Sequence, residues 1–239
     1  MPDHQQVQNF YDEQYYGHVH NQIESRLPWH MRRVAQRLGS LKGKAALDVA
    51  CGTGGWLQEL HKRGAAVSGI DISIRAAEIA RARLSGADIR TGTAERLPFA
   101  DGQFDLVTCM GSLEHFLDQP GALREMRRVA KPSARFLILV PNAGFLTRRL
   151  GLYSGTDQIA IRETVRSINE WTDMFCAAGL LVSARWRDLH PISRDWICRG
   201  SKWHWPARAT QATLLCTWPI GWQYQVYFLC CSCEPAAHA

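Results

Sequence analysis

The chain has 239 residues, of which 46% are hydrophobic and 21% are charged. This composition supports a folded core and argues against intrinsic disorder, and one domain is expected because doubly wound α/β sheets reach this length around a single core. The net charge of +6 leaves anionic partners open, among them nucleic acid, acidic lipid and phosphorylated substrates.

The start of the chain and its cysteines bear on the compartment. The first nine residues are polar and lack the apolar stretch of a secretory signal, and no apolar run reaches the roughly 18 residues of a membrane-spanning helix. We therefore expect a cytoplasmic protein. The eight cysteines are expected to be reduced thiols, and the C-x-C spacing of Cys231 and Cys233 fits no usual zinc site.

Secondary structure is predicted from the periodicity of apolar residues. A polar segment rich in tyrosine and histidine (5–20) precedes a predicted helix at 24–38. From residue 45, short apolar runs alternate with helical patterns, which is typical of βαβ units and a parallel sheet. Strands are predicted at 45–50, 66–71, 87–91, 104–109 and 135–140, with helices at 54–63, 74–84 and 121–130.

The pattern changes after residue 140. A loop at 141–155 is followed by a predicted helix at 167–178 and a strand at 180–189. In the last strand Trp222, Tyr224, Val226 and Phe228 alternate with polar residues, which indicates an antiparallel edge pair. The expected fold class is a doubly wound α/β sheet of seven strands, mostly parallel with an antiparallel last strand, and with helices on both faces.

The stretch 46–56, ALDVACGTGGW, carries the strongest functional signal. A buried strand runs into a tight turn at Gly52 and Gly54, where backbone N–H groups can approach a ligand. The next strand ends in Asp71, a position from which a carboxylate accepts both hydroxyls of a ribose. The structural alternative for Asp71 is a helix cap for the turn near Ser73.

Two kinds of nucleotide ligand could bind to this combination of a glycine-rich turn and a carboxylate at the end of the next strand. A dinucleotide fingerprint needs a third glycine, but Leu57 stands at the sixth place counted from Gly52. Asp48 would also repel a pyrophosphate, whereas it can meet a cationic amino-acid group. A nicotinamide-dependent oxidoreductase is therefore the weaker alternative.

Three motifs carry a family resemblance. Leu47-Asp48-x-x-Cys51-Gly52-Thr53-Gly54 resembles the first motif of class I S-adenosylmethionine-dependent methyltransferases, in particular their ubiquinone-biosynthesis-like small-molecule group. The loop at 91–99 (TGTAERLPF) resembles that group's loop after strand three, and 104–107 with 112–116 (FDLV, SLEHF) resembles its fourth motif. The resemblance covers about 45–140 and implies a Rossmann-like domain.

The resemblance also implies a division of the single domain, 1–239. Residues 1–40 would form an N-terminal helical cap, 41–145 the cofactor-binding core, and 146–239 a substrate-side region with an insert at 190–221. The cofactor would be S-adenosyl-L-methionine. The cofactor-binding residues would be Asp48, Ala50, Gly52, Gly54, Asp71, Ile72, Thr93, Ala94, Glu95 and Met110.

The same resemblance suggests roles along the ligand. Asp48 with the two loop glycines would shape the methionine end, beside Met110, and Asp71 would hold the ribose. Ile72 would pack on the adenine, and the Ala94 backbone would meet the adenine edge. Two departures stand out: Ala50 replaces a frequent glycine, and Thr93 replaces an aspartate that often accepts from the adenine amine, so a charge-assisted bond is lost.

Methyl transfer requires mainly that the acceptor be aligned behind the methyl carbon. His115 is the predicted base for a hydroxyl acceptor, the alternative being a histidine that holds its loop. The histidines in reserve are His18, His20, His30 and His190. The expected reaction is in-line transfer, without a metal, to a hydroxyl or amine of a small molecule; a non-catalytic S-adenosylmethionine-binding protein is a further alternative.

Two segments outside the core are expected to lie on the side of the domain where the methyl acceptor binds. Aromatic residues at 10–16 resemble a cap that closes over the cofactor, or form a helix that packs on the sheet edge. The insert at 190–221 mixes tryptophan with arginine, which suits a flat acceptor, a peripheral membrane or lipid contact, or a loop that buries its tryptophans. The turn after the fourth strand lacks the Asn/Asp-Pro-Pro-aromatic motif, which argues against nucleic acid. The sequence does not indicate the oligomeric state.

Overall fold

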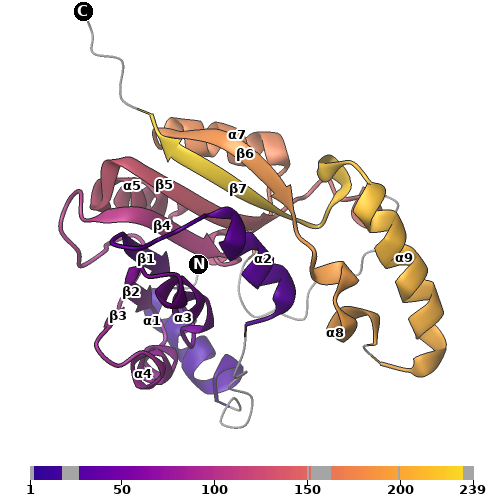
Figure 1. Cartoon of the computed structure of the whole chain (residues 1–239), viewed down its shortest axis with the longest axis horizontal. Helices are drawn as coiled ribbons and strands as arrows, with labels where there is room; N and C mark the ends of the chain where they lie inside the picture. Colours follow the sequence, from indigo (N-terminus) through magenta and orange to yellow (C-terminus); the bar gives the residue numbers. More distant parts are fainter. Residues whose placement is uncertain (1–2, 18–26, 150, 152–162, 199, 234–239) are drawn as a thin grey trace, which may run out of the picture.

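The structure, a computed structural model, describes residues 3–17, 27–149, 151, 163–198 and 200–233. At its centre lies a seven-stranded sheet with the order β3-β2-β1-β4-β5-β7-β6 (Figure 1). The strands are β1 (Ala45–Val49), β2 (Ala66–Asp71), β3 (Asp88–Thr91), β4 (Phe104–Met110), β5 (Ala130–Pro141), β6 (Leu180–Arg187) and β7 (Gln225–Ser232). Strands β1 to β5 pair in parallel, and β7 runs antiparallel between β5 and β6. The predicted fold class is confirmed.

Helices cover both faces of the sheet (Figure 1). One face carries α2 (Trp29–Arg37), α3 (Gly55–Lys62) and α4 (Ile74–Arg83), and the other carries α5 (Gln119–Val129) and α7 (Ile168–Ala177). The remaining helices are α1 (His4–Phe10), the π-helix η1 (Tyr11–Tyr15), α6 (Leu146–Arg149), α8 (Arg194–Ile197) and α9 (Trp205–Thr217). Among the described residues, no helix is long and apolar enough to cross a membrane.

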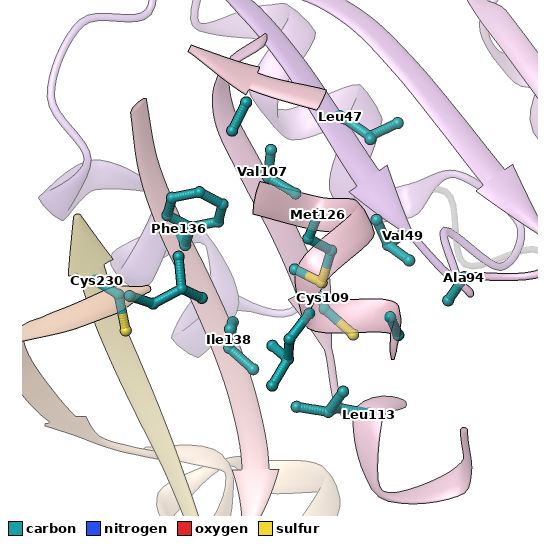
Figure 2. Close-up of a cluster of buried hydrophobic side chains, with 14 of the residues drawn as sticks. Leu47, Val49, Ala94, Val107, Cys109, Leu113, Met126, Phe136, Ile138 and Cys230 are labelled. Carbon is teal, nitrogen blue, oxygen red and sulfur yellow. The ribbon is translucent and has the colours of Figure 1, made fainter. Parts of the chain in front are cut away.

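Each face of the sheet buries its own apolar cluster. Along β1, Leu47 and Val49 belong to the cluster beneath α5 and α7, while Ala46 belongs to the cluster beneath α2, α3 and α4. Figure 2 shows the first cluster, in which Met126 of α5 reaches toward the strands. Burial on both faces explains why these strands appear in the sequence as continuous apolar runs.

The strand predicted at 135–140 begins earlier, at Ala130. Ala130 pairs with Phe104 at the start of β4, and the register then shifts before Arg135 pairs with Leu106. The residues between, 131–133, are partly or fully exposed and polar or proline, so their sequence resembles a turn. The helix predicted at 121–130 correspondingly becomes α5, which ends at Val129.

Strand β7 also differs from its predicted pattern. It begins at Gln225, so Trp222 and Tyr224 precede it, and Val226, Tyr227 and Phe228 are all buried. The antiparallel pair does form the edge of the sheet, but β6 is the outer strand and β7 is covered on both faces. The expected alternation between a buried and an exposed face is therefore wrong.

No helix is predicted in the insert at 190–221, but most of it is helical. It contains α8, the 13-residue α9 and three single turns of 3-10 helix. Pro206 occupies the first turn of α9, a position that favours helix initiation, and good helix formers such as alanine and leucine follow. The predicted helix at 24–38 is α2, which begins at Trp29; its expected start at 24–26 lies outside the described residues.

Candidate functional site

A pocket opens at the carboxyl ends of the parallel strands, where ligands bind in doubly wound sheets. Its empty volume is about 630 Å³, including the part open to solvent. Loops after β1, β2, β3 and β4 line it together with the N-terminal segment. Of the residues predicted from sequence, it is lined by Ala50, Asp71, Ile72, Thr93, Ala94, Glu95 and His115.

The loop after β1 requires unusual backbone angles. Gly52 and Gly54 have φ of 52° and 78°, and Ala50 has φ of 61°, the one positive value among the described non-glycine residues. An alanine in this left-handed region costs roughly 1–2 kcal/mol, which explains why glycine is frequent at this place in the family. At Gly54 a Cβ would lie 3.1 Å from Ala80 Cβ, so the absence of a side chain there lets the start of α3 pack closely against α4. Gly54 does not line the pocket.

Asp71 connects this loop to the end of β2. Its Oδ2 accepts a hydrogen bond of 2.7 Å from the Gly52 N–H, and its Oδ1 accepts one of 2.9 Å from the Ser73 N–H. Burial raises its pKa to about 6; the two N–H donors act in the opposite direction, and the charge of Asp12 adds to the rise. The cap-like bond to Ser73 is present, and the carboxylate also lines the pocket, so the two interpretations of Asp71 are compatible.

Asp48 lies behind the pocket wall rather than in it. The carboxylate is buried on β1, where its Oδ1 accepts a hydrogen bond of 2.6 Å from Thr108 Oγ1 of β4. The Trp56 indole donates to the same hydroxyl at 3.2 Å. Burial raises the pKa of Asp48 well above its ordinary value. Asp48 thus links β1 to β4, and neither it nor Met110 lines the pocket.

The N-terminal segment forms one wall of the pocket. His4, Val7, Tyr11 and Tyr16 line it, and a Cβ placed on Gly52 would lie 3.0 Å from the Tyr16 hydroxyl oxygen. The aromatic segment therefore borders the loop after β1, and the cap interpretation stays a prediction. Helix α2, which was assigned to the same cap, packs instead on α3 and the sheet.

Asp12 attaches this segment to the core, and sequence analysis missed it. Its Oδ1 accepts hydrogen bonds from Ser73 Oγ at 2.5 Å and from the Arg75 N–H at 3.2 Å, at the first turn of α4. Ser73 is the N-cap of that helix, its own Oγ accepting from Ala76 N–H. No local pattern links Asp12 to a helix so far along the chain, although an acid in an aromatic segment is a weak signal for helix capping.

Glu95 performs a similar linking role on the other side of the pocket. Its Oε1 accepts from the Leu117 N–H at 3.1 Å, which joins the loop after β3 to the loop after β4. Its Oε2 lies 3.3 Å from His4 Nε2, an additional contact with the N-terminal segment.

Two adjacent residues of the turn after β4, the buried Glu114 and the half-buried His115, each have one buried polar atom without a hydrogen-bond partner among the described residues. These atoms are Glu114 Oε2 and His115 Nδ1. Burial raises the pKa of Glu114 to about 8 and lowers that of His115. Glu114 is therefore a neutral acid and His115 a neutral imidazole near pH 7, and His115 can accept a proton from a group in the pocket.

The reserve histidines lie elsewhere. Nδ1 of His30 in α2 lies 3.6 Å from Asp188 Oδ1, and the centroid of its ring lies 5.2 Å from that of His190, with the two ring planes tilted by 40°. Neither histidine lines the pocket. His18 and His20 fall outside the described residues. Within the described part of the chain, no three His, Cys, Asp or Glu side chains are arranged to hold a metal ion.

Comparison with known proteins agrees with this geometry. A methyltransferase domain family matches residues 47–138. A demethylmenaquinone methyltransferase of Corynebacterium kroppenstedtii is 31% identical over 168 residues, which cover 64% of this chain and 72% of the relative. The chain belongs to the S-adenosylmethionine-dependent methyltransferase family.

Other relatives match over a shorter span. The ubiquinone biosynthesis O-methyltransferase of Alkalilimnicola ehrlichii is 36% identical over 120 residues, 48% of this chain and 49% of the relative, so this chain aligns with about half the length of that protein. The geranyl diphosphate C-methyltransferase of Streptomyces coelicolor, solved with S-adenosyl-L-homocysteine, shares the fold with a TM-score of 0.65 and 15% identity, over 84% of this chain and 74% of that one.

The pKa of Asp71 predicts a pH-dependent affinity. If Asp71 accepts hydrogen bonds from the ribose hydroxyls of the cofactor, it must be ionised to do so. Cofactor affinity is then expected to be constant well above pH 6 and to fall about tenfold for each pH unit below it. Calorimetric titration with S-adenosylhomocysteine across this range measures the effect. Asp71→Asn should bind more weakly and with no such slope; a slope that persists in the variant contradicts the assignment.

Glu114→Gln is expected to stabilise the protein at neutral and alkaline pH. Because the folded pKa of about 8 exceeds the unfolded value, Glu114 favours folding at low pH, and this contribution is lost as pH rises toward 8. The advantage of the variant in unfolding free energy should grow by on the order of 3 kcal/mol between pH 5 and 8. Denaturant unfolding measures it, with the exposed Glu78→Gln as the control. Parallel stability curves for wild type and variant would exclude the effect.

Asp12→Ala should loosen the N-terminal wall. Loss of a helix-capping acceptor costs about 1 kcal/mol, which corresponds to roughly fivefold faster dissociation of S-adenosylhomocysteine. Stopped-flow dissociation measures the rate, and limited proteolysis of 3–17 reports the detachment. Glu13→Ala removes the same charge from an exposed neighbour and should change neither the dissociation rate nor the proteolysis. Equal effects of the two variants would show that the lost charge, and not the contact with α4, is responsible.

Proposed function

We propose that this chain transfers a methyl group from S-adenosyl-L-methionine to a small-molecule acceptor. The charge of the pocket supports this most directly. The carboxyl groups of Asp71 and Glu95 line it, and no lysine or arginine is found among the described residues that line it. Such a pocket attracts the sulfonium and ammonium groups of this cofactor and repels the pyrophosphate of a dinucleotide.

The alternative of a nicotinamide-dependent oxidoreductase is weakened further by packing. Leu57 stands where a dinucleotide fingerprint has its third glycine, and its side chain is fully buried in the cluster beneath α3. A glycine there would leave a cavity, whereas dinucleotide binding uses that glycine for close packing between helix and strand.

The residues present fit the cofactor in the order that the family resemblance implies. Asp71 would accept from the ribose hydroxyls, Ile72 would pack on the adenine, and Thr93, Ala94 and Glu95 would border the adenine edge. The positive-φ loop at Ala50, Gly52 and Gly54 would receive the methionine end, with Asp48 and Met110 nearby. When bound, the cofactor supplies a methyl group already activated by the sulfonium.

The acceptor in this proposal is an aromatic or quinone-like ring. Two matched relatives carry names that refer to ubiquinone and demethylmenaquinone, and transfer to a ring hydroxyl or an amine requires no metal. The protein's own contribution is alignment and exclusion of water, for which Tyr11 and Tyr16 on one wall and Phe116 on the other provide apolar surface.

His115 is the proposed base. It lines the pocket, burial keeps it neutral, and its buried Nδ1 has no hydrogen-bond partner in the described structure. A neutral imidazole in this position would take the proton of a phenolic hydroxyl as the oxygen attacks the methyl carbon. The protein is proposed to act in the cytoplasm and on a small molecule rather than on nucleic acid.

The decisive experiment combines binding with turnover. Calorimetry should detect S-adenosylmethionine and S-adenosylhomocysteine, and Asp71→Ala should weaken both. With a catechol or a demethylated hydroquinone as acceptor, His115→Gln should lower kcat by about 10²-fold or more while cofactor affinity stays unchanged. His4→Gln, a half-exposed histidine of the same pocket, should leave kcat nearly unchanged.

Three results would contradict the proposal in different ways. Absence of cofactor binding would remove the assignment of the site. Intact cofactor binding without turnover of hydroxyl or amine acceptors would favour a non-catalytic binding protein. Full activity of His115→Gln would leave methyl transfer in place and reduce His115 to a structural role.

A further inference from the structure

The helix α9 is held by few neighbours. It packs on α8 and on the turns η4 (His190–Ile192) and η5 (Lys202–His204), which all belong to the same insert. Of its described side chains only Ala212 is buried. Figure 1 shows α9 standing apart from the sheet, beyond the end of β6. Most of this helix therefore faces outward without support from the core.

The exposed surface of α9 lacks the charges that a helix in water normally carries. Its sequence, WPARATQATLLCT, contains one charged residue, Arg208. That guanidinium is already engaged: it donates to the Trp196 carbonyl at 2.9 Å and lies 5.5 Å from the Trp196 ring. The outward surface is formed mostly by alanine, threonine, proline and leucine, and Leu214 is 49% exposed. A helix with so little charge is expected to be covered by something other than water.

Tryptophans surround this surface. Trp203, just before α9, is 91% exposed, and Trp222, just after the insert, is 37% exposed. Trp29 of α2, 39% exposed, comes to the same region because the adjoining His30 ring lies against His190. Exposed tryptophans at both ends of an uncharged segment are typical of proteins that sit at the boundary between lipid headgroups and acyl chains.

The charge of the insert identifies the kind of surface that complements it. Residues 190–221 contain four Arg or Lys and one acid, Asp195, which gives a net charge of +3, half of the +6 of the whole chain. A symmetric dimer would bring the exposed cations of the insert, among them Arg194 and Lys202, close to those of a second copy, which is unfavourable. Anionic lipid headgroups complement it, and each cation near such a surface adds to the attraction.

The insert lies at the functional edge of the sheet. Arg187, the last residue of β6, pairs with Val226 of β7, which in turn pairs with Val140 near the end of β5. The insert therefore leaves the sheet at the same edge as the carboxyl ends of the parallel strands, where the pocket opens.

We propose that the insert docks this protein on an anionic lipid bilayer, with Trp203 and the uncharged face of α9 at the headgroup boundary and Lys202 among the headgroups. Docking holds the pocket edge of the sheet close to the bilayer. The inference concerns where the protein sits and does not depend on methyl transfer, because vesicle binding is measured without cofactor or acceptor.

The test uses the full chain and two kinds of vesicle. Co-sedimentation should show binding to mixed phosphatidylglycerol–phosphatidylcholine vesicles and little binding to phosphatidylcholine alone, and the binding should weaken as salt rises. Trp203→Ser should reduce affinity about tenfold, and Lys202→Gln about fivefold at low salt. Tryptophan emission should shift to the blue on binding, and less so in Trp203→Ser.

Matched controls separate docking from general surface effects. Leu181→Ser removes a 52% exposed leucine at the opposite end of β6, and Lys62→Gln removes an exposed cation at the end of α3. Both should bind vesicles as the wild type does. Because Trp203 is almost fully exposed, Trp203→Ser should keep the wild-type circular dichroism and cofactor affinity.

Several results would overturn the proposal. One is that the protein binds both vesicle types equally well, and another is that it binds neither of them. Another is a Trp203→Ser variant that binds vesicles like the wild type. A wild-type dimer in sedimentation velocity that Trp203→Ser dissociates would assign the surface to a second copy. Preferential binding to polyuridylate, lost in the same variant, would assign it to nucleic acid.

Discussion

The site depends on the way the buried carboxylate of Asp71 is satisfied. Only 6% of this residue is exposed, and a buried charge without partners is strongly unfavourable. Its partners are two backbone donors, the Gly52 N–H and the Ser73 N–H, one on each oxygen. Burial raises the pKa of Asp71 above its ordinary value, and the two N–H donors, which carry no full charge, offset only part of that rise. The carboxylate keeps its capacity to accept from a ligand.

This arrangement couples segments that are distant in the chain. The loop after β1 can reach Asp71 only because its positive φ angles turn the Gly52 amide toward β2. Ser73 is shared, since its N–H donates to Asp71 and its hydroxyl donates to Asp12 of the N-terminal segment. The N-terminal wall of the pocket is thus attached, through Asp12 and Ser73, to the turn that also binds Asp71. A change in the Asp12 contact is therefore expected to affect Asp71, and the reverse.

The parts that sequence predicted are those encoded by local patterns. Alternating apolar runs and helical periods specify β1 to β4 and their helices, and the order of Asp48, Gly52 and Asp71 places a pocket at the strand ends. What it missed depends on distant contacts or on solvent exposure. Asp12 caps α4 through a contact that no spacing encodes, and Pro132 and Ser133 resemble a turn although β5 has already begun. The helices of the insert were not predicted. The content of tryptophan and arginine does not indicate them, whereas the helix propensity of the alanines and leucines in α9 does.

The acids around the pocket also bear on how the reaction ends. Burial raises the pKa of Asp48 well above its ordinary value and that of Glu114 to about 8, whereas Asp71, with a pKa of about 6, is mostly ionised near pH 7. A sulfonium beside these groups favours their ionised forms, which strengthens its own binding. Transfer of the methyl group converts the sulfonium into a neutral thioether, and the Coulomb attraction, about 2–3 kcal/mol for a single pair at roughly 6–8 Å and an effective dielectric constant near 20, disappears with it. In the proposed reaction, a pocket lined by acids and, among its described residues, by no lysine or arginine would hold the methyl donor more tightly than the demethylated product. This difference would favour exchange of product for fresh donor.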